Sequence, residues 1–161
     1  MRKLRNPWIG MKEYHCFGCC PDNPEGLKME FFEEGDDIIS YWHPQQHYEG
    51  WVGVLHGGVI ATLLDEACGW VIFRKMQCSG FTTKLEVKYH KQISSIEPQI
   101  TVRAHLQQMR HGLAFIEARI EDAAGDVCAS AQATYFCQSP QKSIEMGFKK
   151  CEAEDEQLLS F

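Results

Sequence analysis

A pair of glycines and an aspartate in the middle of the chain could do chemistry, and Asp65 lies eight positions after the first glycine, Gly57. Gly57 and Gly58 open an apolar stretch with many strong helix formers, and the first backbone N–H groups of a helix have no partner within it. Because the helix dipole favours negative charge there and glycine leaves the donors uncovered, these amides could hold a phosphate or an acyl-transfer oxyanion. Asp65 follows on the same stretch and could act as a nucleophile or general base.

The helix that must position these groups is predicted over residues 56–75. At about 100° per residue, its large apolar side chains gather on one side and Asp65 projects from the other. The apolar side comprises Val59, Ile60, Leu63, Leu64, Ala67, Trp70 and Val71. The side of Asp65 also carries Gly58, Ala61, Thr62, Cys68 and Gly69. These small residues leave room for a slim ligand, or simply for close packing beside a solvated carboxylate.

The spacing along this helix bears on how both groups could act on one substrate. Eight residues correspond to about 12 Å along the axis and a rotation of about 80°. Gly57 and Asp65 of one chain therefore cannot both reach one carbonyl group. If they cooperate, the carboxylate of one subunit must meet the helix start of another, and function would require a dimer.

Strand patterns flank the helix on both sides. Residues 27–31 alternate between apolar and polar, and a turn at 35–37 separates them from a β-branched and aromatic segment at 38–42, which predicts a hairpin. Four further strands are predicted at residues 81–93, 99–109, 113–121 and 127–137. Their short connections favour antiparallel neighbours. An α+β fold follows, in which about six strands curl around one helix and leave its open side to a second subunit.

The composition is that of one globular domain. The 161 residues are 44% apolar and 24% charged, which excludes a disordered, coiled-coil or collagen-like protein, and the net charge of −6 disfavours a nucleic-acid partner. We expect a single domain over residues 1–161, with an irregular N-terminal segment at about 1–26 and a C-terminal tail at about 140–161. Within that tail, a short helix is predicted at 141–148, and the acidic residues 151–156 are expected to be mobile.

The eight cysteines bear on the compartment. Residues 1–15 show no apolar run of a secretory signal, and the apolar stretch 59–73 is too short and too polar to span a bilayer. We therefore expect a cytoplasmic protein with reduced thiols and no membrane partner.

The same cysteines could contribute to a zinc site. Cys16, Cys19 and Cys20, followed by His43 and His47, offer enough ligands in principle. The gap between the two groups is much longer than in a zinc finger. We expect instead that the cysteines pack the N-terminal segment over the sheet, with no metal site and no cofactor.

The sequence from His56 to Glu66, HGGVIATLLDE, resembles the signature of the hotdog-fold thioesterases, specifically their phenylacetyl-CoA thioesterase-like (PaaI-like) branch. Two other segments are similar to that branch, namely residues 16–27, with CFGC and NPEGL, and residues 82–89, TTKLEVKY. The resemblance covers roughly residues 14–137. It implies the hotdog fold, an antiparallel sheet wrapped around one long helix, and assembly into homodimers or homotetramers.

The resemblance also implies an activity, hydrolysis of an acyl-CoA thioester to a carboxylic acid and CoA. By this likeness Asp65 is the nucleophile or general base, the amide of Gly57 polarises the thioester carbonyl, and His56, followed by Gly58, shapes the turn. The site is implied to lie between subunits. Since a thiolate leaves readily, one carboxylate and one oxyanion hole can suffice.

Substrate-binding residues are predicted around this motif. Thr82 and Thr83 are candidate supporting hydroxyls, and Arg110 is the cation expected to meet the phosphates of CoA. Related enzymes often carry Asn or Gln six residues before the motif histidine, where this chain has Gly50. Glu49, or one of the three residues before it, could take over the orienting role.

Two other functions remain open. The missing amide at position 50 favours a non-catalytic acyl-CoA-binding protein with the same fold. A hydratase or dehydratase ranks third, because such enzymes pair a histidine with a carboxylate and the only close histidine, His56, lies at the helix start. The acyl group is not specified by the aromatic residues, which could line a pocket or fill the core: Trp51, Trp70, Phe73, Phe81 and Tyr89.

Overall fold

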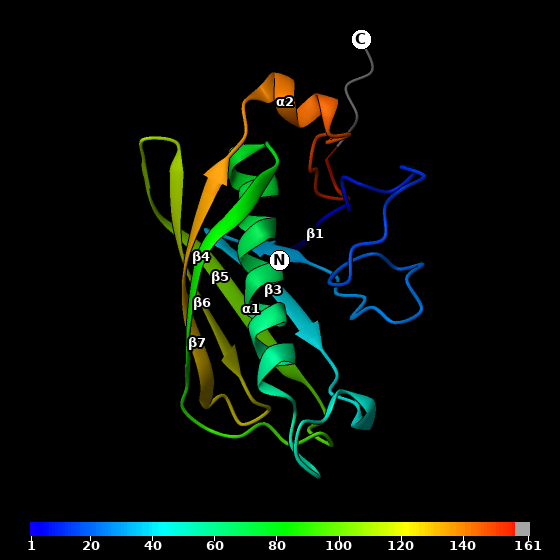
Figure 1. Cartoon of the computed structure of the whole chain (residues 1–161), viewed down its shortest axis with the longest axis vertical. Helices are drawn as coiled ribbons and strands as arrows, with labels where there is room; N and C mark the ends of the chain where they lie inside the picture. The colour runs from blue at the N-terminus through cyan, green and yellow to red at the C-terminus, as the bar shows by residue number, and fades with distance from the viewer. Residues whose placement is uncertain (157–161) are drawn as a thin grey trace.

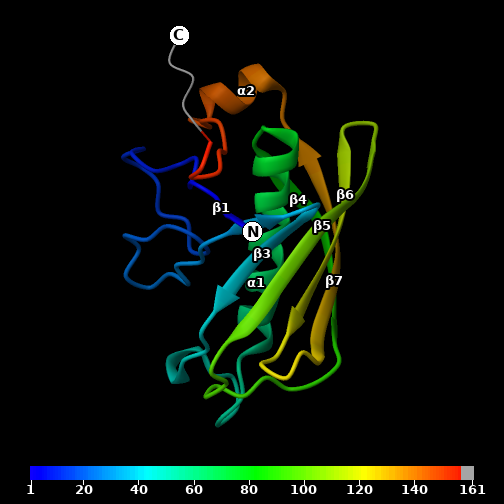
Figure 2. The same ribbon diagram turned by 180° about the vertical axis from the view of Figure 1, so that it is seen from behind.

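A seven-stranded antiparallel sheet curls around one long helix in the computed structural model, which describes residues 1–156 (Figure 1). The strands are β1 (Arg2–Lys3), β2 (Phe32–Glu34), β3 (Asp37–Trp42), β4 (Gly80–Tyr89), β5 (Ile100–Arg110), β6 (Leu113–Glu121) and β7 (Val127–Cys137). Their order across the sheet is β1-β2-β3-β5-β6-β7-β4. Seen from behind, the sheet lies in front of the helix (Figure 2). The predicted α+β class and hotdog arrangement are confirmed.

The central helix, α1 (Gly57–Val71), begins one residue after the predicted start. His56 caps it, since its Nδ1 accepts a hydrogen bond from the Gly58 amide at 2.8 Å. A π-helical turn, η2 (Ile72–Met76), continues it to Gln77, whose left-handed backbone (φ 52°) ends the helix. The interpretation of 56–75 as one buried helix is therefore confirmed.

One side of α1 is buried by the sheet as predicted, and the burial extends further than the helical wheel indicates. Cys68, on the side of Asp65, is fully buried, so the small residues there serve close packing at this position. The cause is the curvature of the sheet, which brings β7 over part of that side. Tyr135 of β7 lies there, with its hydroxyl 3.8 Å from the point where a side chain on Gly69 would begin.

The prediction of a strand at residues 27–31 is wrong, although the predicted alternation between buried and exposed side chains is present. Leu27, Met29 and Phe31 are buried, whereas Lys28 and Glu30 are exposed. Lys28 has a left-handed φ of 52°, and the amides of Leu27 and Met29 donate to carbonyls of the N-terminal segment instead of a neighbouring strand. Strand β2 therefore starts only at Phe32.

The other strand predictions are confirmed with shifted ends. Residues 38–42 form β3 and the four later strands form β4 to β7, with β4 ending at Tyr89 rather than at residue 93. The seventh strand, β1, has two residues, too few to produce a periodic pattern. Two short helices complete the fold, η1 (Gln46–Tyr48) in the loop before α1 and α2 (Pro140–Glu145), which is shorter than predicted.

The expectation of a mobile tail at 151–156 is wrong. Cys151 and Ala153 are fully buried, and Ala153 forms a β-bridge with Leu4, so that the tail lies against the N-terminal segment (Figure 1). The acidic residue Glu156 is held by Arg74 at 2.7 Å. The acidic segment is ordered because its carboxylates pair with cations and its apolar residues are buried. Residues 157–161 lie outside the described residues.

Arg74 is expected to be a principal electrostatic contributor to stability. Its guanidinium binds Glu33 at 2.9 Å and Glu156 at 2.7 Å, and only 11% of its side chain is exposed. Arg74→Met should therefore reduce the free energy of unfolding at pH 7 by about 2 kcal/mol, because Lys75, 2.7 Å from Glu33, offsets part of the loss. The matched variant Lys142→Met removes an exposed ion pair with Glu145. It should lower the free energy of unfolding by less than about 0.5 kcal/mol.

The contribution of Arg74 should also depend on pH. Arg74, followed by Lys75, lowers the pKa of Glu33 from 4.5 to about 2. A depressed carboxyl pKa stabilises the folded state above the unfolded value, so this stabilisation is lost as the pH falls from about 4.5 to about 2. Urea denaturation at pH 7 and pH 3 should show a smaller difference between wild type and Arg74→Met at pH 3. An equal difference at both pH values would contradict this assignment.

Candidate active site

The carboxylate of Asp65 projects from the middle of α1 toward β4 and β7. Its Oδ1 accepts hydrogen bonds from the Thr82 hydroxyl at 2.8 Å and from the Tyr135 hydroxyl at 2.5 Å. Tyr135 is 4% exposed; burial, with the nearby Asp65 charge, raises its pKa well above the ordinary value, so it stays protonated and donates. Oδ2 accepts no hydrogen bond within residues 1–156 and is left for water or a ligand.

Asp65 lies at a small cavity of about 240 Å³. The other lining residues are Glu66, Gly69, Ile72, Phe73, Gly80, Phe81, Thr82 and Tyr135. Pockets for drug-sized ligands usually measure about 300–1,000 Å³. One chain therefore presents a place for a reacting group at Asp65, with too little room for a whole acyl-CoA molecule.

One of the two glycine amides at the start of α1 is uncommitted. The amide of Gly58 is occupied by His56, so the expectation that both glycine amides are uncovered is wrong for Gly58. The amide of Gly57 has no acceptor in the part of the chain that the structure describes. The carbonyl of Gly57 accepts a hydrogen bond from the Tyr89 hydroxyl at 2.7 Å, which fixes the first turn against β4.

Gly57 and Asp65 line different cavities. Gly57 belongs to a cavity of about 300 Å³ that it shares with Tyr89 and the residues just after β4. No residue lines both this cavity and that of Asp65. The separation along α1 therefore persists in the folded chain, and a single subunit does not bring the two groups together.

Residues 52–129, which span α1 and the start of β7, match the family model described as Thioesterase superfamily. The chain carries a thioesterase superfamily domain. A curated relative, an uncharacterized protein of Schizosaccharomyces pombe, is 33% identical over 58 residues, which are 35% of this chain and 33% of that protein. The chain thus aligns with about a third of the length of this relative.

Solved structures of thioesterase superfamily proteins share the fold. One of them, 24% identical, superposes with a TM-score of 0.70 over 75% of this chain and 62% of its own. Zebra fish thioesterase superfamily member 2 is 21% identical, with a TM-score of 0.63 over 71% of this chain and 88% of its own. A hypothetical thioesterase of Streptococcus pneumoniae, determined with coenzyme A, is 19% identical, with a TM-score of 0.64 over 69% of this chain and 86% of its own. At these identities the likeness shows the hotdog fold.

Four residues are predicted to bind substrate: Thr82, Thr83, Arg110 and Glu49. Among them, only Thr82 contacts Asp65. Thr83 follows it at a β-bulge and donates to the Thr134 carbonyl at 2.9 Å. Arg110 is exposed at the last position of β5, at the end of the sheet where Phe136 pairs with Phe81 beside the Asp65 cavity.

Glu49 and Gly50 lie at the other end, beside the start of α1. The Glu49 carboxylate accepts the Ser95 hydroxyl at 2.7 Å and makes no contact with Asp65. A side chain on Gly50 would begin 3.1 Å from the His56 ring, tighter than ordinary contact. The glycine at position 50 therefore makes room for the histidine cap.

Sequence reasoning missed Tyr135, which holds both the carboxylate and the backbone carbonyl of Asp65. A weak signal was present, because Tyr135 is the only bulky side chain in the buried row that continues through Ala129, Ala131 and Ala133. It lies beyond the residues that match the family model. Its register, opposite Thr82 on β4, explains how both hydroxyls reach one carboxylate oxygen.

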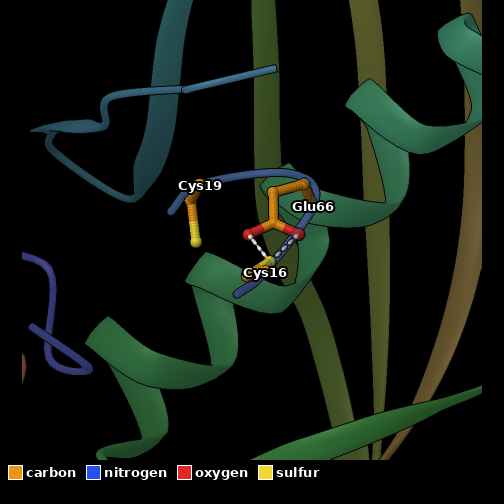
Figure 3. A group of neighbouring side chains, drawn as sticks. All are labelled: Cys16, Cys19 and Glu66. Atoms are coloured by element: carbon orange, nitrogen blue, oxygen red, sulfur yellow. Dashed lines mark hydrogen bonds between the residues drawn. The ribbon is translucent and has the colours of Figure 1, made fainter. Parts of the chain in front are cut away.

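The cysteines and histidines considered for zinc do not form one site. His43 Nδ1 is bonded to the Pro98 carbonyl at 2.7 Å, and the Cys20 thiol donates to the Tyr14 carbonyl. Cys16 and Cys19 instead meet Glu66 of α1 (Figure 3). Hydrogen bonds from the Cys19 thiol and nearby amides lower the pKa of Cys16 to about 5, whereas burial raises the pKa of Glu66 to about 8.

Proposed function

We propose that this protein hydrolyses an acyl-CoA thioester, as a PaaI-like thioesterase, at a site shared between two subunits. The observation that carries the proposal is the Asp65 carboxylate, with one oxygen fixed by two hydroxyls and the other open to a cavity. The thioesterase superfamily domain supports the reaction class. The structural neighbour determined with coenzyme A supports the choice of CoA as the carrier.

In the proposed reaction, Oδ2 of Asp65 takes a proton from a water molecule that attacks the thioester carbonyl. The new C–O bond gives a tetrahedral oxyanion, which the free amide of Gly57 from the second subunit stabilises. The oxyanion collapses, the C–S bond breaks, and CoA leaves as a thiolate that takes up the proton held by Asp65, which restores the carboxylate. Thr82 and Tyr135 hold Oδ1, so the open oxygen keeps its direction toward the water.

The edge strand β4 supports the two-subunit site. It pairs with β7 on one side only within residues 1–156, and its large side chains Phe81 and Tyr89 are 52% and 54% exposed. Phe81 lies at the Asp65 cavity and Tyr89 at the Gly57 cavity. Antiparallel association of two β4 strands would bring the Asp65 end of one chain to the Gly57 end of the other, with Arg110 near the rim for the CoA phosphates.

The proposed compartment is the cytoplasm. All eight cysteines are free thiols, the state that a reducing compartment maintains. In the described chain no helix is long and apolar enough to cross a bilayer.

A panel of short-chain, long-chain and aryl acyl-CoAs tests the function. The purified chain should release CoA from at least one of them, with product measured by chromatography because the protein thiols would react with thiol reagents. Isothermal titration on the same panel provides the comparison. Binding without release across the panel would replace the proposal by the non-catalytic acyl-CoA-binding protein, which the absent amide at Gly50 favours.

A further inference from the structure

Three ligand atoms converge where the N-terminal segment crosses α1 (Figure 3). The Cys16 sulfur lies 3.5 and 3.6 Å from the two carboxylate oxygens of Glu66, and the ligand atoms of Cys16, Cys19 and Glu66 all lie within 4.8 Å of one another. Zinc binds sulfur at about 2.3 Å and carboxylate oxygen at about 2.0 Å, so that the two ligand atoms of a tetrahedral site are about 3.5 Å apart. The Cys16 sulfur and the Glu66 carboxylate therefore already have the spacing of two zinc ligands, and the Cys19 sulfur lies within 4.8 Å of both.

The local backbone is shaped to close on the carboxylate. A side chain on Gly18 would overlap the carboxyl group of Glu66, so either the loop or that carboxyl group would have to move; with glycine the Cys16–Cys19 loop lies directly against it. The loop is anchored on both sides of Gly18, since the carbonyls of Phe17 and Gly18 accept the amides of Leu27 and Met29. The ligands are consequently held by fixed elements before any ion binds.

The charge of the cluster also favours a cation. Glu66 forms no ion pair with a lysine, arginine or histidine among residues 1–156, whereas Glu33 is met by three cations, Arg2, Arg74 and Lys75. Its neighbours Cys16 and Cys19 are themselves acids, and Cys19 is 3% exposed. All three ligands bind as anions, so a divalent ion would displace the protons that remain on the thiols and on the Glu66 carboxyl group and would cancel two of the three negative charges.

We propose that Cys16, Cys19 and Glu66 bind a zinc ion that fastens the N-terminal segment to α1. Thiolate ligands favour zinc over magnesium or calcium, and three protein ligands leave a fourth position for water. Glu66 follows Asp65 in sequence and lines the same cavity, so the ion would stiffen one wall of that cavity. The inference does not rest on hydrolysis, because the ligand geometry is independent of the reaction.

Cobalt substitution tests the assignment on the full chain. Protein stripped with a chelator under reducing conditions and titrated with Co²⁺ should develop sulfur-to-cobalt charge-transfer absorption that saturates at one ion per chain and disappears when Zn²⁺ is added. The absorption should be lost in Cys16→Ser and in Cys19→Ser and weakened in Glu66→Gln. Cys20→Ala is the matched control, because Cys20 lies in the same loop with its thiol directed to Tyr14; it should bind cobalt as the wild type does.

Thiol protection provides a second measurement that needs no variant. Zinc should slow the alkylation of Cys16 in the unmutated chain, measured by peptide mass spectrometry, and should leave the half-buried Cys137 unaffected. Absence of both the cobalt absorption and the protection would overturn the proposal, as would normal cobalt absorption in Cys16→Ser.

Discussion

Asp65→Asn is expected to lower acyl-CoA turnover by about 10³-fold while the protein stays folded, the loss expected for removing a general base. In the proposed reaction, Oδ2 of the Asp65 carboxylate is the atom that accepts the proton of the attacking water. Asparagine keeps the shape and the Oδ1 acceptor, so the Thr82 and Tyr135 hydroxyls retain their partner. Steady-state hydrolysis of the best acyl-CoA from the panel gives the rate, and circular dichroism with the melting temperature reports the fold.

The matched control is Asp36→Asn, which removes an exposed carboxylate in the β2–β3 turn and should leave turnover unchanged. Glu66 borders the same cavity, but its carboxylate oxygens both accept the Cys16 thiol, so we do not expect it to take over the role of Asp65. Wild-type turnover in a folded Asp65→Asn protein would remove Asp65 from the mechanism.

The elements of the fold that could be predicted are those in which the pattern is local. The apolar side of α1, the β-branched and aromatic residues of β3 and the turn-bounded segments of β5, β6 and β7 are each features of one continuous segment, and the structure has these elements at nearly the predicted residues. Residues 27–31 show the limit of this reasoning. Their alternation reports burial correctly, but burial does not say whether the backbone pairs with a strand or with the loop at Phe17 and Gly18.

The candidate site shows the same limit more strongly. Asp65, His56 and Gly57 could be singled out because they lie in one helical segment, whereas their partners come from distant parts of the chain. Tyr135 is 70 positions from Asp65, and Cys16 is 50 positions from Glu66. Such contacts depend on strand register and on the path of a loop, neither of which leaves a periodic trace in the sequence.

Gly57→Pro is expected to reduce turnover by about 10²-fold or more, the usual effect of removing one oxyanion donor. Proline lacks the amide hydrogen and is well tolerated at the first position of a helix. The preceding residue, His56, already has the extended backbone that proline requires (φ −61°, ψ 135°). A side chain at position 57 would meet the Tyr89 ring at 3.6 Å, an ordinary contact, so the fold should persist.

Gly57→Ala is the matched control, because it adds the same first carbon but keeps the amide hydrogen. We expect its turnover to stay within about threefold of the wild type, so that the difference between the two variants isolates the N–H group. Equal losses in both variants would indicate a steric effect at the helix start and would exclude the amide as the donor.

Mixing the two inactive variants decides whether the site is shared between subunits. In a dimer of Asp65→Asn with Gly57→Pro, one site would combine the intact Asp65 of one chain with the intact Gly57 of the other, and the second site would lack both. Random reassortment after reversible dissociation makes half of the dimers mixed, each with one working site of two, so activity should return to about a quarter of the wild-type value. A site contained within one chain would recover nothing, because every subunit would still carry its own defect. Size-exclusion chromatography of each variant alone must show the same dimer, since the recovery depends on exchange between equivalent assemblies.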